Sequence, residues 1–348
     1  MIKKKISICA LACAMAFTGM TGCGSEDNSS GSVNPSAYES ENNVPANTGS
    51  DTDSLSIVCT IFPEYDWVKE ILGTHTDHIE VSYLLDSGVD LHSYQPTVND
   101  MMKISDCDLF VYVGGESDKW ADNAVSSSSS QNMKVINLME ILGDAAKVEE
   151  LKEGMQSEEE EESEDEGEEA EYDEHVWLSL KNAKLLCTEI EKNIESIDAE
   201  NAAYYKANLD SYISELSVLD NSFETLIGSS SVKALVFGDR FPFRYFVDDY
   251  GLDYYAAFIG CSAESEASFE TVKFLSDKIK ELDCDTVFTL ENSNKDIVNS
   301  IITNSGKKNV KIAELNSLQS VSKNDIKNGA SYISLMQKNY DVLSRTLK

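Results

Sequence analysis

The strongest constraint on the fold is an alternation of short apolar runs with helical stretches, which occurs twice. In the first part of the chain, the apolar runs are 55–60, 78–85, 108–113 and 134–139. In the second part, they are 232–237, 252–258, 286–290 and 310–315. Strands that alternate with helices of about ten residues form parallel sheets with right-handed crossovers. We therefore predict an α/β protein with two lobes, each a roughly four-stranded parallel sheet flanked by helices.

A segment between the two patterns predicts one long helix. Its apolar side chains recur at steps of three and four residues: Leu209, Tyr212, Ile213, Leu216, Leu219, Phe223 and Leu226. Asp198 can open this helix, and about thirty residues at about 1.5 Å each would span about 45 Å. The expected organisation is an N-terminal lobe at 55–197 with an acidic loop at 149–174, a linking helix at 198–228 and a C-terminal lobe at 229–348.

The first residues predict export and lipid anchoring. A basic start, a short apolar run and a small-residue cleavage region predict a signal peptide at 1–22. Cys23 follows Thr-Gly, as in the lipobox of bacterial lipoproteins, and is the expected lipidation site. Residues 23–54, rich in Ser, Asn, Asp and Gly, suit a flexible tether. A plain secretory peptide that happens to contain Cys23 is the alternative.

Five cysteines would remain in the mature domain: Cys59, Cys107, Cys187, Cys261 and Cys284. Their spacing is wide, and none forms a Cys-x-x-Cys pair. We interpret them as buried small hydrophobic residues rather than as a zinc finger or a disulfide framework.

The charge of the chain indicates a cationic ligand. The formal net charge is -34, which argues against nucleic acid or an anionic membrane surface as a partner. Thirteen of the eighteen residues at 157–174 are Asp or Glu, and the run ends at His175. Such a run repels itself and predicts a solvated loop. It is either a spacer or an approach for a cation.

Candidate metal ligands follow several of the predicted strands. His92 lies in the loop after the second strand, and His175 follows the acidic run. Asp239 and Glu291 follow the first and third strands of the second lobe. Ligands bind beyond the carboxyl ends of parallel strands, and imidazole with carboxylate suits Zn²⁺, or Mn²⁺ where oxygens outnumber nitrogens. His75 and His78 instead suggest a polar turn.

Three segments resemble the solute-binding lipoproteins of zinc and manganese ABC transporters. Residues 90–96 are similar to the first ligand motif of that family, 173–178 to the second, and 245–252 to the segment after the third ligand. The resemblance covers about residues 55–347 and implies a metal site between two lobes joined by one helix. It also implies transfer of the metal to a membrane permease.

One position departs from the family pattern. The family's third histidine falls on Arg240, whose guanidinium stays protonated and cannot bind a metal. Asp239 beside it can bind one, although it could equally cap a helix or pair with an arginine. The resemblance implies an acidic fourth ligand, on Glu291 or Asp296, and we expect Glu291 because it stands at the strand end. Asp239, Asp296 or water would complete the shell.

We therefore expect a monomeric, extracytoplasmic receptor, held to the membrane only by its lipid, that binds Zn²⁺ or, less readily, Mn²⁺. It would be a transport protein rather than an enzyme. Two alternatives remain open from the residues alone: a secreted metallohydrolase that uses the same ligands, and a surface adhesin that holds a cationic partner with the acidic loop.

Overall fold

Four parallel strands form the sheet of the first lobe. The computed structural model describes residues 54–347 apart from 76, 129, 131, 157–170 and 263–265, and all of these belong to the unit Asp51–Lys348. The strands are β1 (Leu55–Cys59), β2 (Ile79–Tyr83), β3 (Leu109–Tyr112) and β4 (Lys134–Asn137), in the order β2-β1-β3-β4. Ile57 in the central strand β1 is aligned with Val81 of β2 and Leu109 of β3. Every residue of β3 is buried, whereas the edge strands β2 and β4 have exposed positions, as expected for a covered parallel sheet.

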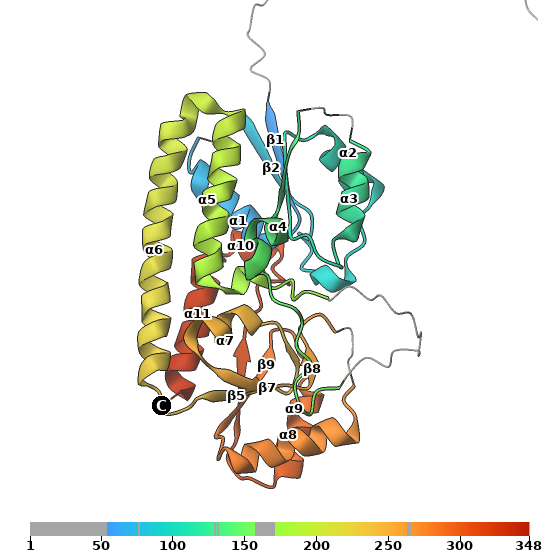
Figure 1. Cartoon of the computed structure of the whole chain (residues 1–348), viewed down its shortest axis with the longest axis vertical. Coiled ribbons are helices and arrows are strands. Elements are labelled where there is room, and N and C mark those ends of the chain that lie inside the picture. The colour runs from blue at the N-terminus through green and yellow to red at the C-terminus, as the bar shows by residue number, and fades with distance from the viewer. Residues whose placement is uncertain are drawn as a thin grey trace, which may run out of the picture. The chain divides into compact units, whose positions relative to one another are not determined.

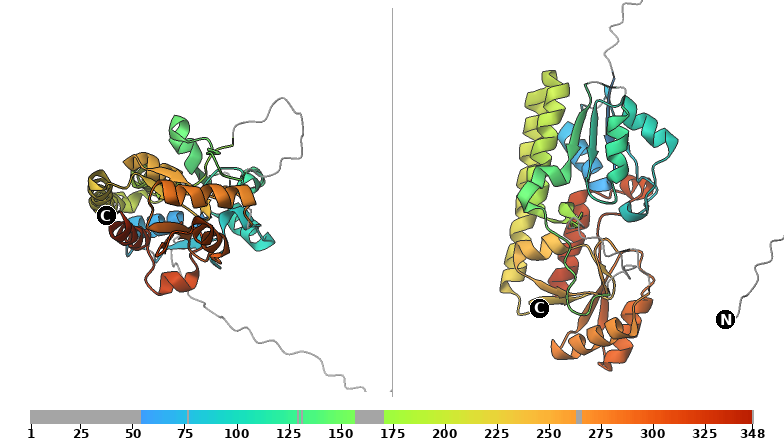
Figure 2. Two further views of the ribbon diagram at one scale, coloured as in Figure 1. Left: turned by 90° about the horizontal axis from the view of Figure 1, so that it is seen from below. Right: turned by 45° about the vertical axis from the view of Figure 1, so that its right-hand side comes forward.

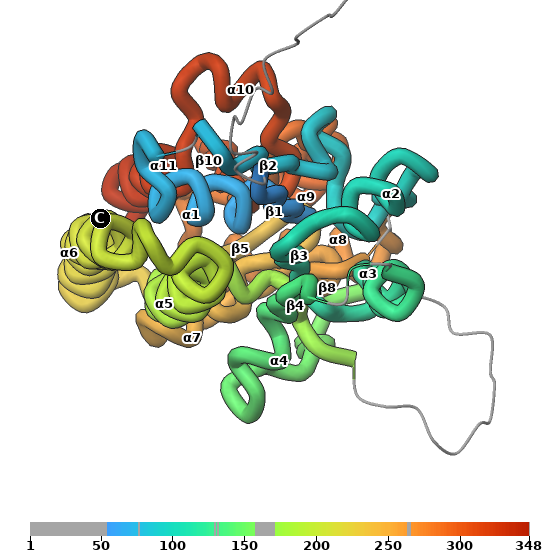
Figure 3. The backbone as a smooth tube through the Cα atoms, turned by 90° about the horizontal axis from the view of Figure 1, so that it is seen from above, coloured from blue at the N-terminus to red at the C-terminus, as the bar shows by residue number. Residues whose placement is uncertain are grey.

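Helices cover both faces of this sheet. They are α1 (Phe62–Leu72), α2 (Val98–Asp106), α3 (Lys119–Ser126), the short α4 (Leu138–Leu142) and α5 (Leu180–Ile197). Figure 3 shows α1 and α5 on one side of the strands and α2 and α3 on the other. Helix α1 begins directly after β1 because Pro63 suits the first turn and the Glu64 carboxylate accepts hydrogen bonds from the Thr60 and Ile61 backbone N–H groups.

The strands of the second lobe are arranged in parallel pairs, and four of the six have only two or three residues. They are β5 (Ala234–Val236), β6 (Arg240–Phe241), β7 (Asp253–Tyr255), β8 (Phe258–Ile259), β9 (Thr286–Leu290) and β10 (Lys311–Leu315). The pairs are β5 with β7, β6 with β8 and β9 with β10, and a parallel bridge between Phe237 and Phe288 joins the end of β5 to β9. The helices are α7 (Arg244–Tyr250), α8 (Phe269–Glu281), α9 (Asp296–Ser305), α10 (Lys323–Lys327) and α11 (Tyr332–Thr346).

Helix α6 (Ala202–Ser229) runs beside both lobes (Figures 1 and 2). Its 28 residues correspond to about 42 Å at about 1.5 Å each. It packs on α1 and α5 of the first lobe and on α7 and α11 of the second. Its buried residues recur at three- and four-residue steps: Tyr205, Leu209, Tyr212, Leu216, Leu219, Phe223 and Ile227. Burying each such side chain stabilises the fold by roughly 1.5–3 kcal/mol, so one helix fixes both lobes.

The predicted α/β class, the parallel strands and the long joining helix are confirmed. Three local features differ from prediction. Asp198 opens a 3-10 turn, Ala199–Asn201, and α6 itself begins after it, at Ala202. The Asp198 carboxylate makes no capping hydrogen bond, and it accepts from Tyr205 and contacts His78. The run 252–258 forms two strands, β7 and β8, rather than one. The start of the expected acidic loop packs on the second lobe, where the Gln156 N–H donates to the Ala257 carbonyl and Lys152 pairs with Asp253.

Several expectations lie partly or wholly outside the described residues. They are the signal peptide, the Cys23 lipidation site, the tether before Ser54 and most of the acidic run. The division into lobes at 198–228 stays a prediction, and we use first lobe for 54–197 and second lobe for 230–347. In the described part of the chain, no helix combines the length and apolar character needed to cross a bilayer.

Candidate metal centre

His175 is held in a buried turn just before α5. It is fully buried, directly before the 3-10 turn Val176–Leu178, and Ser179 caps α5 by accepting from the Asn182 N–H. The Trp177 indole N–H donates to the Ser317 carbonyl at 2.9 Å, and the Tyr332 hydroxyl donates to the Trp177 carbonyl at 2.6 Å. Because Ser317 and Tyr332 belong to the second lobe, these bonds position the histidine at the junction of the lobes.

His92 reaches the same point from the loop after β2. It lies in the 3-10 turn Leu91–Ser93, which is capped by the Asp90 carboxylate accepting from the His92 N–H at 3.0 Å. Its side chain is 6% exposed. The loop is anchored to the second lobe as well, because Arg240 Nη2 donates to Asp90 Oδ2 at 2.8 Å.

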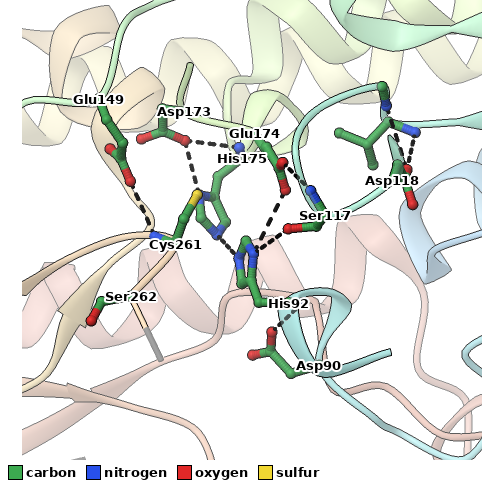
Figure 4. Close-up of polar contacts among 12 residues, drawn as sticks. Asp90, His92, Ser117, Asp118, Glu149, Asp173, Glu174, His175, Cys261 and Ser262 are labelled. Atoms are coloured by element: carbon green, nitrogen blue, oxygen red, sulfur yellow. Dashed lines mark hydrogen bonds and ion pairs between the residues drawn. The ribbon is translucent and has the colours of Figure 1, made fainter. Parts of the chain in front are cut away.

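The two imidazoles face each other through their Nε2 atoms, which are 3.1 Å apart. Figure 4 shows the rings meeting at these atoms, with Ser117 and Asp173 at their other nitrogens. In a tetrahedral zinc site with bonds of about 2.1 Å, two nitrogens lie about 3.4 Å apart. The pair is therefore already close to the spacing that a shared zinc ion requires.

The neighbours of the two Nδ1 atoms favour metal-ready tautomers. His175 Nδ1 is 2.8 Å from Asp173 Oδ1, and His92 Nδ1 is 2.8 Å from Ser117 Oγ and 3.6 Å from Glu174 Oε2. In the metal-free structure the two Nε2 atoms share a hydrogen bond, so one of them carries a proton. With a metal at the Nε2 atoms, oxygens at these positions would accept from protons held on Nδ1. Burial lowers the pKa of His175 to about 4, and burial together with the charge of His175 lowers the pKa of His92 to about 3. Both rings are therefore neutral at pH 7.

Cys261 brings a third potential ligand atom close to the two imidazoles. Among the described residues, one group of His, Cys, Asp and Glu side chains brings three ligand atoms within 4.8 Å of one another, and it is His92, His175 and Cys261. Cys261 follows β8, and its N–H donates to Glu149 Oε1 at 3.1 Å. Burial, and next the charge of Glu149, raise the pKa of its thiol well above the usual value.

The Gln319 amide completes the contacts around His175. With its nitrogen donating to the two Asp90 oxygens at 2.9 and 3.1 Å, its oxygen accepts from His175 Nε2 at 2.7 Å. In this orientation, the amide presents an oxygen to the same space as the Nε2 atoms of the two imidazoles. The potential metal ligands at this point are thus two nitrogens, one sulfur and one oxygen.

Buried carboxylates surround this group and favour a cation. Asp173, Glu174 and Asp118 are at most 1% exposed, and each has one oxygen without a hydrogen-bond partner among the described residues. Burial raises the pKa of Asp173 to about 7, and burial with the charge of Glu174 raises that of Asp118 to about 7. A buried carboxylate oxygen without a hydrogen bond is costly, and a nearby cation offsets that cost.

Comparison with known proteins identifies the family. The family model described as "Zinc-uptake complex component A periplasmic" matches residues 57–346. The chain belongs to this zinc-uptake family. It is 31% identical over 296 residues to the high-affinity zinc uptake system protein ZnuA of Bacillus subtilis, covering 85% of this chain and 88% of that protein.

Other members of the family are longer or have been solved with zinc. The zinc-binding lipoprotein AdcA of Streptococcus pneumoniae serotype 4 is 29% identical over 292 residues, which cover 84% of this chain but only 56% of AdcA. The Zn(II)-bound ZnuA-like domain of S. pneumoniae AdcA is similar in structure, with a TM-score of 0.65, 27% identity and coverage of 84% of this chain and 99% of that domain. The laminin-binding adhesin of Streptococcus agalactiae, at 24% identity and a TM-score of 0.68, shows the shared fold alone.

Within this member of the zinc-uptake family, two of the four predicted ligands meet and two are engaged elsewhere. His92 and His175 meet. Asp239 Oδ1 accepts from the Arg240 N–H, and its Oδ2 accepts from the Thr289 hydroxyl and the Leu290 N–H.

Glu291 accepts from the Ser317 N–H and hydroxyl at 2.8 and 2.6 Å, and burial raises its pKa. Metal binding by Asp239 and Glu291 stays a prediction. His75 and His78 lie apart from the centre, His75 against Tyr204 and His78 bonded to Asp198.

Two contributors to the centre were missed from the sequence, Cys261 and Gln319. The expectation of buried, unpaired cysteines holds for Cys59, Cys107 and Cys187, and all five cysteines in the described residues are free. Cys261 is only partly buried, and no motif marked it. Its one signal in the sequence was its place shortly after the apolar run at 252–258, where ligands of parallel sheets are found.

Proposed function

We propose that this protein captures Zn²⁺ between its two lobes and delivers it to the permease of an ABC transporter. The observation that carries the proposal is the pair of buried, neutral imidazoles whose Nε2 atoms lie 3.1 Å apart. The surrounding carboxylates supply the negative potential, and the family supplies the precedent of zinc uptake. Zinc is favoured over Mn²⁺ because nitrogen and sulfur predominate among the nearby donors.

His92 and His175 are the proposed principal ligands. Asp239 and Glu291 remain proposed oxygen donors, and each must first release the hydrogen bonds that now hold it. For Glu291 this means leaving Ser317, and for Asp239 it means leaving Thr289 and Leu290. The Gln319 oxygen accepts from His175 Nε2, and that bond is lost when the imidazole nitrogen binds the metal, while the amide nitrogen keeps its bonds to Asp90.

The proposed setting is the outer face of a bacterial membrane, with the chain anchored by a lipid on Cys23. The resemblance of the first residues to a lipoprotein signal supports the anchor, and the description of AdcA as a lipoprotein agrees with it. The permease is the expected partner because the matched family is a component of an uptake complex.

Equilibrium zinc binding against a chromophoric chelator tests the proposal. The wild-type chain should bind one zinc ion, and His92→Ala and His175→Ala should each weaken binding by about 100-fold or more, since the loss of a supporting residue alone costs 10–100-fold. His75→Ala is the matched control, because that imidazole lies against Tyr204 and outside the centre. Unchanged zinc affinity in both His92→Ala and His175→Ala would overturn the proposal.

A further inference from the structure

We propose that Cys261 is a zinc ligand and makes this site selective for thiophilic cations. The proposal rests on the proposed function and deepens it by naming the class of metal. Its basis is the group of His92, His175 and Cys261, whose ligand atoms all lie within 4.8 Å. In a tetrahedral site, sulfur and nitrogen lie about 3.6 Å apart, so the sulfur must approach by about 1.2 Å at most.

The position of Cys261 is built by contacts from both lobes. Glu149, from the segment that leaves the first lobe, accepts from the Cys261 N–H. The next residue, Ser262, accepts from Arg240 Nη1 through its carbonyl at 3.4 Å. The residue before it, Gly260, packs so closely on His175 that an added Cβ would lie 2.9 Å from Cε1 of the imidazole. The Cys261 sulfur therefore belongs to a segment that packs tightly against the His175 imidazole.

Arg240 explains why a new ligand is needed. It stands where the family resemblance places a histidine, and its guanidinium cannot bind a metal. Instead it pairs with Asp90 at 2.8 Å, a bond that joins the His92 loop to the second lobe. The segment around Arg240 would then give the metal no ligand at this position. Cys261, which follows β8, faces the same two imidazoles.

A sulfur donor changes which metals the site retains. Thiolate ligands favour Zn²⁺ and softer ions, whereas Mn²⁺ prefers carboxylate, carbonyl and water. A site with two imidazoles, a thiolate and one oxygen should therefore bind Zn²⁺ far more tightly than Mn²⁺. When the ion binds, the Zn–S bond replaces the S–H bond, and the proton leaves to solvent.

Cobalt(II) substitution in the full chain, kept reduced and stripped of metal, tests the proposal. The wild type should show the thiolate-to-cobalt charge-transfer absorption, and Cys261→Ser should lose it and bind Zn²⁺ at least about tenfold more weakly. Cys284→Ser, a change at another partly buried free cysteine, should keep both properties. Cys261→Asp should still bind Zn²⁺, but its cobalt form should lack the thiolate-to-cobalt absorption. The difference between its affinities for Zn²⁺ and Mn²⁺ should be smaller than in the wild type.

A second measurement needs no variant. Zn²⁺ should protect Cys261 of the wild type from alkylation, as followed by mass spectrometry, and should leave Cys284 as reactive as before. If the wild type binds zinc through His92 and His175 but shows neither the absorption nor the protection, the role of Cys261 is overturned and the proposed function stands. If the wild type binds no zinc, both fall.

Discussion

Replacing Gly260 with alanine should weaken zinc binding by displacing the imidazole of His175. An added Cβ would lie 2.9 Å from His175 Cε1, 3.0 Å from its Nδ1 and 3.0 Å from the Phe241 carbonyl oxygen. Carbon atoms in ordinary contact are about 3.5–4.0 Å apart, so something must move by about 0.6 Å. The Phe241 carbonyl belongs to β6 and is fixed by the backbone, which leaves the imidazole to yield.

The size of the effect follows from the narrow tolerance of metal bonds. Zinc–ligand distances vary by only about 0.2 Å between sites. Overpacking a core costs about 1–3 kcal/mol of folding stability. We expect zinc affinity to fall by about tenfold or more, which corresponds to about 1.4 kcal/mol. Gly260 does not have a left-handed backbone conformation, so the change introduces no backbone strain of that kind.

Chelator competition for zinc and urea unfolding of the same samples provide the assay. Gly228→Ala in α6 is the matched control, because an added Cβ there meets nothing within 4 Å. The control should keep its zinc affinity and gain about 0.5–1 kcal/mol of stability, since alanine is favoured over glycine in a helix. Zinc affinity of Gly260→Ala within twofold of the wild type would refute the steric argument.

Three further predictions concern other parts of the molecule. Burial raises the pKa of Asp66 in the folded state to about 7, above the value of 3.8 for an unperturbed aspartate. The folding stability that this group contributes is therefore full below about pH 4, and it is lost as the pH rises through 7. Asp66→Asn, which keeps an acceptor for the Tyr332 N–H, should remove up to roughly 4 kcal/mol of that pH dependence in urea unfolding. Asp173→Ala should weaken zinc binding by about 10–100-fold, because it removes the oxygen that orients His175 Nδ1. Deletion of 157–167 should leave equilibrium zinc affinity unchanged and slow zinc association at low ionic strength.

Each of these has a contrary outcome. Equal loss of stability between pH 4 and pH 8 in wild type and Asp66→Asn would show that the Asp66 carboxyl is not the titrating group. Zinc affinity of Asp173→Ala equal to that of the wild type would remove the role of Asp173 in orienting His175. Loss of tight zinc binding on deleting 157–167 would mean that the acidic run holds the metal itself.

The fold was predictable because its elements have local signatures. The helical spacing of Leu209, Tyr212, Leu216 and Phe223 marks α6 without knowledge of any other part of the chain, and all four are buried along one face. The short apolar runs mark the strands in the same way. Asp198 precedes the 3-10 turn that leads into α6, but its carboxylate binds His78, a partner 120 residues away that no local pattern reveals.

The candidate metal centre was predictable only where motif and strand position agreed. His92 and His175 stand in distinctive loops, and the structure brings them together. Asp239 also follows a strand, but β9 lies beside β5, and its Thr289 hydroxyl takes one carboxylate oxygen. Cys261 depends on Glu149, which is 112 residues earlier in the chain and accepts from its N–H. Such partners are set by the packing of the two lobes rather than by neighbouring residues.

A crystal structure of the zinc-loaded chain, with anomalous data collected on both sides of the zinc absorption edge, tests the central claim most directly. We predict one zinc peak within about 2.1 Å of the Nε2 atoms of both His92 and His175. A fully loaded protein whose zinc peak lies elsewhere, with the two imidazoles still facing each other without a metal, would contradict it.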